Sequence, residues 1–286
     1  MTNIYGYRPS TLRRLVRLFT KSLIRILRLN TANIFSAEFI QQLLPYKIII
    51  VPNAQVPHLK FLSTHGRLLW RANTLLTEEP LIVDWLSSLK PDDIYLDVGA
   101  NVGSYVLLAK SYCPELTIYA AELDFNCLYL MYHNLVVNKL QDNVLLLPFA
   151  MSTGETVSTI FYRDLSQGDA LQSIGSPSQF STSQSSKKHN FTHLTYSIDS
   201  LLATFNLAPP THIKIDIDGN ELQFLEGAKK TLSSASQVYF EHSLTPECDQ
   251  VQNYLMQIGF NQSKEAPMYS TVDHSKCVGY NRLFTR

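Results

Sequence analysis

From residue 79 onward, short apolar runs alternate with longer stretches of helical periodicity. The apolar runs predict core strands at residues 94–96, 117–121, 144–147, 212–217 and 237–241. The other stretches predict helices at residues 79–89, 125–138, 200–205, 219–232 and 247–259. This alternation predicts an α/β fold with a mostly parallel central sheet, helices on both of its faces and right-handed crossovers.

Shorter strand patterns flank and interrupt this core. Residues 46–51 predict a strand and residues 68–70 predict a second, so we expect residues 37–78 to be an accessory segment with a small hairpin. Residues 152–163 alternate like a strand at a sheet edge or in a hairpin. Residues 193–198 predict one more strand before the fourth core strand.

The main domain, expected at residues 79–286, contains one stretch of different composition. Residues 166–190 are dominated by Ser, Gln, Gly and Thr and hold few large apolar side chains. Such a segment buries too little surface to order itself, so we expect a flexible loop. Two interpretations stay open, a lid near the active site and an insertion without a catalytic role.

Charge is distributed unevenly along a chain whose formal net charge is zero. No acidic residue precedes Glu38, whereas seven basic residues do, namely Arg8, Arg13, Arg14, Arg17, Lys21, Arg25 and Arg28. Most of them recur at three- and four-residue steps opposite apolar positions, so residues 1–36 predict a basic amphipathic helix. Peripheral membrane contact through residues 8–28, with each cation contributing about 1 kcal/mol, is one interpretation. A helix packed on the catalytic domain, with its charges in water, is the other.

The remaining composition narrows the class of protein. After residue 37 the chain carries 17 Lys and Arg against 24 Asp and Glu. We therefore expect this mildly acidic part of the protein to lack the basic surface that binds nucleic acid. The sequence shows neither a run of about 18 uncharged apolar residues nor a secretory signal. Its four cysteines lie far apart without a zinc-binding spacing. We therefore expect a cytoplasmic protein, either free or held at the inner face of a membrane.

The most informative stretch is Asp97–Gly103, which directly follows the core strand at residues 94–96. A buried strand that leads into small residues and then into the apolar face of a helix is typical of a ligand-binding loop. We expect Gly99 and Gly103 to let the chain turn tightly and approach a ligand without an intervening Cβ. A dinucleotide fingerprint has outer glycines five residues apart and a third between them, whereas these are four apart with Asn101 between. A ligand without a pyrophosphate therefore fits better.

A second carboxylate points to a nucleoside. The strand at residues 117–121 ends at Glu122, 25 residues after Asp97. A carboxylate at the tip of the second strand of a βαβ unit can accept hydrogen bonds from both hydroxyls of a ribose. Asp97 and Glu122 together predict a nucleoside with a polar or positively charged tail, and S-adenosylmethionine (SAM) meets that description. An ordinary strand-to-helix turn with an acidic end is the structural alternative.

Residues 93–105 and the segment Ile213–Glu221, which reads Ile-Lys-Ile-Asp-Ile-Asp-Gly-Asn-Glu, resemble the first motif and the later signature of the FkbM family of SAM-dependent methyltransferases. The resemblance covers residues 79–260. It implies a Rossmann-like class I methyltransferase fold and methyl transfer to hydroxyls of saccharides or secondary metabolites. Leu123 stands where the family usually has proline, and Asp218 stands where it more often has glutamate.

The expected SAM site lies at the carboxyl ends of the strands, where the ligand crevice of a parallel sheet is found. Its predicted members are Asp97, Gly99, Ala100, Asn101, Gly103, Glu122, Phe149 and Ala150. Glu122 is assigned to the ribose, Asp97 to the amino end of the methionine and Asn101 to its carboxylate end. Phe149 and Ala150 are assigned to walls around the adenine, with a plain core turn as an equal alternative.

A hydroxyl acceptor must lose a proton, and several groups near the fourth and fifth core strands could take it. The candidates for a general base or an orienting group are Asp216, Asp218, Glu221 and His242, of which Asp216, Asp218 and His242 are predicted to be catalytic. Helix capping is the structural alternative for Asp218 and Glu221, and simple packing is the alternative for His242. Asp216 and Asp218 could instead hold a divalent metal such as Mg²⁺.

The sequence thus predicts a SAM-dependent O-methyltransferase that acts on a hydroxyl of a saccharide, glycolipid or secondary metabolite. Two other classes stay open. One is a non-catalytic module that binds SAM or a partner. The other is a nucleotide-dependent oxidoreductase, which the glycine spacing disfavours.

Overall fold

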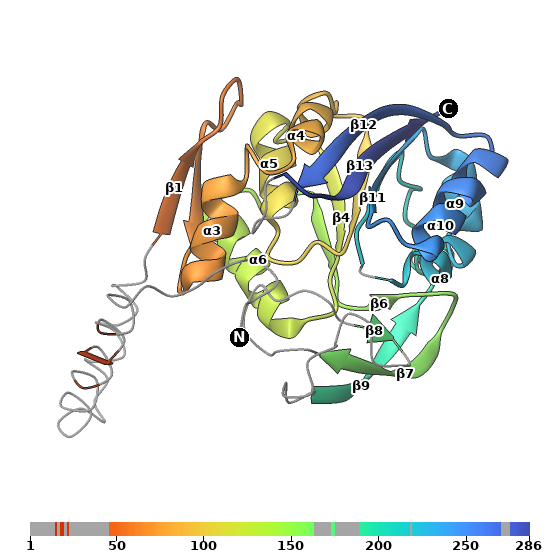
Figure 1. Ribbon diagram of the computed structural model, residues 1–286, viewed down its shortest axis with the longest axis horizontal. Coiled ribbons are helices and arrows are strands. Elements are labelled where there is room, and N and C mark those ends of the chain that lie inside the picture. The colour runs from red at the N-terminus through yellow and green to blue at the C-terminus, as the bar shows by residue number, and fades with distance from the viewer. Residues whose placement is uncertain are drawn as a thin grey trace. The chain divides into compact units, whose positions relative to one another are not determined.

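Figure 1 shows the computed structural model of the chain, which describes residues 46–162, 173–174, 189–217, 219–269 and 275–286, together with Leu15, Leu18, Phe19 and Ser22. The chain divides into a smaller unit, residues 1–45 and 269–278, and a larger unit, residues 46–268 and 279–286. The larger unit holds the fold described below.

Little of the smaller unit is described. Leu15, Leu18, Phe19 and Ser22 are helical, and the three apolar side chains among them are exposed. The other residues of the basic helix predicted at residues 1–36 lie outside the described residues. The same holds for most of residues 8–28, where membrane contact was expected. Within the described part of the chain, no helix has the length and apolar character needed to span a membrane.

A seven-stranded sheet, in the order β12-β13-β11-β10-β3-β4-β5, forms the centre of the larger unit. Its parallel strands are β3 (Ile94–Val98), β4 (Thr117–Ala121), β5 (Val144–Leu147), β10 (His212–Ile215) and β11 (Gln237–His242). β13 (Cys277–Thr285) pairs antiparallel with β11, and β12 (Asn261–Tyr269) is the edge strand beside it. The strand order reverses between β3 and β10, which is where sheets of this kind bind ligands.

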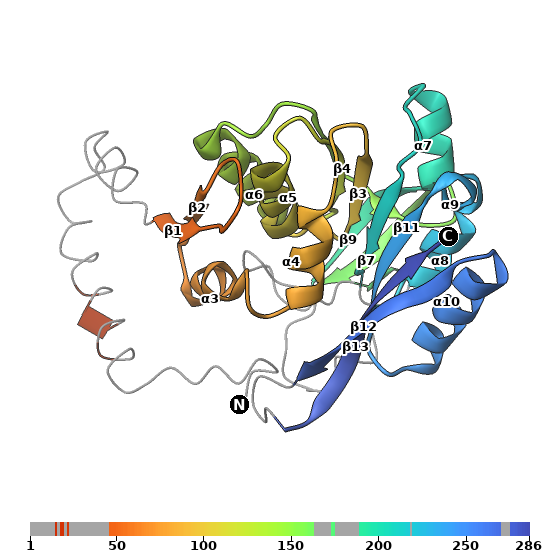
Figure 2. The same ribbon diagram turned by 90° about the horizontal axis from the view of Figure 1, so that it is seen from above.

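Helices cover both faces of this sheet (Figure 2). One face carries α4 (Pro80–Ser87), α5 (Ser104–Tyr112) and α6 (Phe125–Asn138), and the other carries α7 (Ile198–Thr204), α8 (Glu221–Glu226), α9 (Lys229–Ser234) and α10 (Pro246–Gln257). Side chains alternate between the two layers, so Tyr95 packs in the first apolar cluster and Leu96 in the second. The predicted α/β class, with a mostly parallel sheet covered on both faces, is confirmed.

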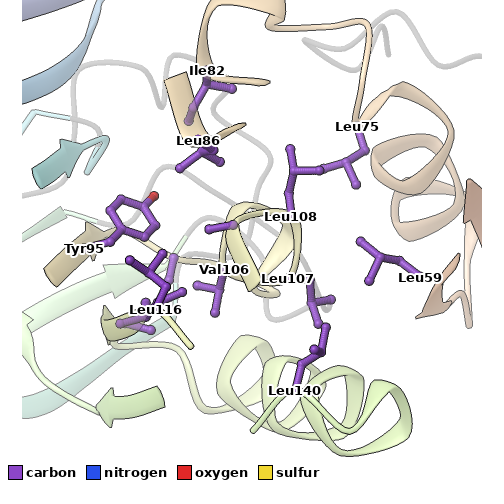
Figure 3. Close-up of a cluster of buried hydrophobic side chains, with 14 of the residues drawn as sticks. Leu59, Leu75, Ile82, Leu86, Tyr95, Val106, Leu107, Leu108, Leu116 and Leu140 are labelled. Atoms are coloured by element: carbon purple, nitrogen blue, oxygen red, sulfur yellow. The ribbon is translucent and has the colours of Figure 1, made fainter. Parts of the chain in front are cut away.

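Helix α5 forms the middle of the first apolar layer (Figure 3). Its Val106, Leu107 and Leu108 are fully buried among side chains of α4, α6, β3 and the accessory hairpin. Fully burying one such aliphatic side chain contributes about 1.5–3 kcal/mol. The helix that follows the glycine loop is therefore firmly held, and it fixes the loop in front of it.

The accessory segment differs from its prediction. β1 (Tyr46–Ile50) does pair in a hairpin, but its partner is β2 (His58–Leu62). The strand predicted at residues 68–70 is wrong, because those residues lie inside helix α3 (Gly66–Thr74). Leu68 and Ala72, four residues apart, are both buried. That helical spacing extends beyond the three-residue apolar run on which the strand was predicted.

The helix predicted at residues 219–232 is also divided, into α8 and α9. The break falls at Gly227, where a Cβ atom would lie 2.0 Å from the carbonyl oxygen of Ser152. Close contact with that backbone explains both the glycine and the interruption. The hairpin strands β12 and β13 at the C-terminal end had not been predicted at all.

A separate four-stranded sheet interrupts the main domain after β5. It contains β6 (Ala150–Met151), β7 (Thr156–Tyr162), β8 (Ser173–Ile174) and β9 (His189–Tyr196), in the order β6-β9-β7-β8. The strand predicted at residues 152–163 is thus present as β7, which pairs antiparallel with β8 and β9. β8 and the start of β9 fall within residues 166–190, where a loop was expected, because pairing with β7 orders them. The rest of that stretch lies outside the described residues.

Candidate functional site

The loop after β3 folds back onto the end of β4. Gly99, Asn101 and Gly103 all have positive φ angles, of 85°, 50° and 78°. The N–H groups of Gly99 and Ala100 both donate to the carbonyl oxygen of Ala121, at 3.0 Å each. These bonds hold the loop beside the residue that follows β4, which is Glu122.

The two glycines make room for the protein itself. A Cβ on Gly99 would lie 1.9 Å from the carbonyl oxygen of Asp216, and one on Gly103 would lie 2.6 Å from Cγ of Met131. From the sequence, both glycines were expected to let the chain approach a ligand closely. The structure gives another reason for them, namely that Gly99 lets the loop touch the end of β10 and Gly103 lets it touch α6.

Glu122 is a buried carboxylate held by backbone amides. One oxygen accepts from the N–H of Asn101 at 2.8 Å, and the other accepts from the N–H of Asp124 at 2.7 Å. Burial raises the pKa of Glu122 to about 7, although these hydrogen bonds act in the opposite direction. The side-chain oxygen of Asn101 accepts from the N–H of Val102 at 2.9 Å, which fixes the tight turn. The predicted contact of Asn101 with the methionine carboxylate stays a prediction.

Asp97 lies at the other end of the loop, in a row of polar groups that crosses three strands. Lys214 of β10 is the register partner of both Asp97 on β3 and Tyr239 on β11. The Lys214 ammonium lies 3.3 Å from an Asp97 oxygen and donates to Asp216 at 2.9 Å. Burial alone lowers the pKa of Lys214, but Asp216 and Asp97 outweigh it and the pKa is raised. Burial raises the pKa of Asp97 against the opposing effect of Lys214.

Glu79, which precedes the first residue of α4, contacts this row through two tyrosines. Its two oxygens accept from the hydroxyls of Tyr105, at 2.7 Å, and Tyr239, at 3.2 Å. Burial, followed by the charge of Asp216, raises the pKa of Glu79. Neither Glu79 nor Lys214 was among the residues predicted for the site. Lys214 did leave a signal, because it is a charged residue within an apolar strand and shares a face with Asp216.

An aromatic cavity of about 580 Å³ lies beside the start of α6. It is lined by Asp124, Phe125, Asn126, Pro148, Phe149, Tyr162, Phe191, Thr192, His193 and Leu194. Phe125 stacks on His193 with ring centroids 6.0 Å apart, and Tyr162 and His193 share a hydrogen bond of 2.7 Å. Phe149 thus lines this cavity, and its role as a wall for the adenine stays a prediction. Ala150 does not line the cavity, because it packs with Ile160 and Tyr162.

The candidate catalytic residues lie in different surroundings. Asp216 follows β10 beside Lys214, and its side chain keeps 32% of its exposure. Asp218 lies outside the described residues. Both oxygens of Glu221 accept from the N–H of Gly219 at 3.0 Å, and Gly219 precedes the N-cap residue of α8. His242 is buried, and its ring nitrogens bond Asp249 at 3.0 Å and the N–H of Leu244 at 3.1 Å. Its contacts therefore run to α10 and the preceding loop.

Metal binding was left open for Asp216 and Asp218. Among the described residues, no group of three or more His, Cys, Asp or Glu side chains has an arrangement that could hold a metal ion. The ammonium of Lys214 takes the place between Asp97 and Asp216 where two carboxylates would otherwise face each other.

A comparison with models of protein families identifies the family of this chain. The methyltransferase FkbM domain matches residues 97–264, a range that begins at the loop and includes the later signature. The chain belongs to this family. It is therefore a methyltransferase, and the predicted family is confirmed. Methyltransferases of this kind generally use SAM as the methyl donor.

Individual relatives are more distant. The hexuronic acid methyltransferase AglP of Haloferax volcanii is 24% identical over 173 residues, which cover 60% of this chain and 65% of that protein. The precorrin-6y C5,15-methyltransferase of Geobacter metallireducens GS-15 is 15% identical with a TM-score of 0.45, and covers 75% of this chain and 92% of its own. The precorrin 8w decarboxylase of Methanobacterium thermoautotrophicum is 15% identical with a TM-score of 0.42, with 73% and 90% covered.

Proposed function

We propose that this methyltransferase transfers a methyl group from SAM to a hydroxyl oxygen of a saccharide or of a saccharide-bearing lipid or metabolite. The observation that carries the proposal is the position of Glu122. It is a buried carboxylate at the end of β4, its two oxygens are held by the backbone around the glycine loop, and an aromatic cavity begins two residues later. This combination suits a nucleoside whose ribose hydroxyls meet a carboxylate and whose base meets aromatic rings.

The residues present fit SAM along the whole loop. Glu122 would bind the ribose, and Phe149 would form one wall for the adenine. Asp97 would bind the amino end of the methionine, because it is fully buried and neither of its oxygens accepts a hydrogen bond from the described residues. When bound, SAM supplies a methyl group that its positively charged sulfonium has already activated.

The acceptor assignment draws on the relative that acts on a hexuronic acid. Transfer to a hydroxyl forms a new O–CH₃ bond, breaks the S–CH₃ bond and releases the hydroxyl proton, so the site needs a group to take that proton. Asp216 is the carboxylate best placed for this role, because it is partly exposed at the carboxyl end of β10 and touches the glycine loop. Lys214 holds its orientation through the 2.9 Å bond.

Methyl-labelled SAM tests the proposal with a panel of neutral sugars, uronic acids and glycolipids. We expect label to enter a hydroxyl of a saccharide. We also expect Asp216→Asn to keep SAM binding while its turnover falls by about 10²–10⁴-fold, the usual contribution of a general base. Alkali-labile label on a uronic acid would indicate a carboxylate ester and contradict the hydroxyl assignment. SAM binding without turnover on any acceptor would favour a non-catalytic module.

A further inference from the structure

The polar row at the carboxyl end of the sheet carries more carboxylates than cations. Lys214 is buried and already has two partners, Asp97 at 3.3 Å and Asp216 at 2.9 Å. Glu79 is a third carboxylate in the same cluster, since it bonds Tyr239, the register partner of Lys214, and Tyr105, whose ring centroid lies 5.5 Å from the Lys214 ammonium. One ammonium therefore faces three carboxylates.

Glu79 is held by neutral groups. The hydroxyls of Tyr105 and Tyr239 each donate to one of its oxygens, at 2.7 and 3.2 Å. Burial, followed by the charge of Glu79, raises the pKa of both tyrosines well above the ordinary value, so they stay protonated donors. Phenol hydroxyls orient a carboxylate without neutralising its charge. The partly exposed Glu79 thus leaves negative charge available to a ligand.

Two observations connect this charge with the donor site. Tyr105 is the second residue of α5, so it follows the glycine loop immediately. Asp97, the first residue of that loop, is completely buried, and neither carboxylate oxygen accepts a hydrogen bond from the described residues. Glu79 itself precedes the segment matched by the family model, residues 97–264, so that match gives it no role.

We infer that Glu79 is a donor-recognition residue whose negative charge selects the cationic methyl donor over its neutral product. The inference rests on the proposed function. Methyl transfer breaks the S–CH₃ bond and leaves its electron pair on sulfur. The product, S-adenosylhomocysteine, is therefore a neutral thioether. Donor and product share the nucleoside, the amino group and the carboxylate. A carboxylate near the sulfur therefore favours the donor and weakens product binding after transfer.

Isothermal titration with SAM, S-adenosylhomocysteine and sinefungin tests this selection without requiring turnover. Sinefungin carries a cationic amine in place of the sulfonium. We expect Glu79→Gln, which keeps the shape but removes the charge, to weaken SAM and sinefungin by about tenfold and to leave S-adenosylhomocysteine within about twofold. Glu79→Asp keeps the charge and should restore most of the difference.

Glu78→Gln is the matched control, because Glu78 is an adjacent exposed carboxylate that bonds Thr74 rather than the tyrosines. It should leave all three affinities unchanged. Equal weakening of all three ligands by Glu79→Gln would overturn the inference, because it would indicate a purely structural role. A protein that binds none of the three would instead contradict the proposed function.

The wild-type protein gives a second measurement in case Glu79→Gln fails to fold. The groups that face Glu79 are Tyr105, Tyr239, Lys214, Asp216 and Glu78. Of these, the tyrosines and Lys214 keep their protons throughout the acidic and neutral range. Burial raises the pKa of Glu79, so lowering the pH protonates it and the ratio of SAM affinity to S-adenosylhomocysteine affinity should fall. A ratio that stays constant from pH 8 to pH 5 would contradict the inference.

Discussion

The two carboxylates that bracket the glycine loop, Asp97 and Glu122, are both buried but are compensated in different ways. Asp97 lies against the ammonium of Lys214, whereas Glu122 is held by the N–H groups of Asn101 and Asp124. An ammonium supplies a full charge and ties Asp97 into a charged cluster. Among the described residues no cation pairs with Glu122, and its oxygens can accept further hydrogen bonds from neutral hydroxyls. One end of the loop is therefore suited to the charged part of a ligand and the other to its ribose.

The largest expected effect comes from removing the cation at the Asp97 end. Lys214→Met should lower the free energy of unfolding by about 3–5 kcal/mol, because the buried Asp97 and the partly exposed Asp216 would both lose the ammonium that pairs with them. Urea denaturation measures this change. Lys229→Met, on the exposed surface of α9, is the control and should stay within about 0.5 kcal/mol. A loss below about 1 kcal/mol for Lys214→Met would show that Asp97 does not depend on an ammonium and so does not differ from Glu122 in this respect.

A smaller loss is expected where the loop meets β10. Gly99→Ala should lower the free energy of unfolding by about 3 kcal/mol, since it combines a positive φ with overlap against the Asp216 carbonyl. Gly219→Ala separates the two causes, because Gly219 has φ of 97° but no atom of the described residues within 4 Å of its Cβ position, its chain neighbours aside. That variant should lose only about 1–2 kcal/mol. Equal losses in the same denaturation experiment would remove the argument that close packing requires Gly99.

The smallest expected effect is a change of SAM affinity with pH at the Glu122 end of the loop. Because the pKa of Glu122 is about 7, its ionised fraction rises as the pH increases from 6 to 8. Only the ionised carboxylate offers its full acceptor capacity to ribose hydroxyls. SAM affinity should therefore increase about tenfold over this interval in the wild type. Calorimetric titration of Glu122→Gln gives the baseline, and an identical pH dependence in that variant would assign the effect to another group.

Glu122 could be predicted to follow a strand because the apolar run before it forms β4, whereas Asp97 lies inside β3, one residue before its end. The roles of Gly99 and Gly103 could not be predicted, because the atoms they accommodate belong to Asp216 and Met131, far away in the sequence. Glu79 was missed for the same reason, since helix α4 and two tyrosines bring it to the site. The prediction at residues 68–70 was wrong because three apolar residues do not distinguish a strand from a turn of helix.

The position of SAM at Glu122 is the central claim, and equilibrium binding of SAM to Glu122→Ala tests it most directly. The variant removes the acceptors for two ribose hydroxyls, and bonds to a charged group contribute about 1.5–3 kcal/mol each, so affinity should fall at least about 100-fold. The control Glu226→Ala, at an exposed carboxylate of α8, should bind like the wild type. Wild-type affinity for SAM in a folded Glu122→Ala protein would contradict the account.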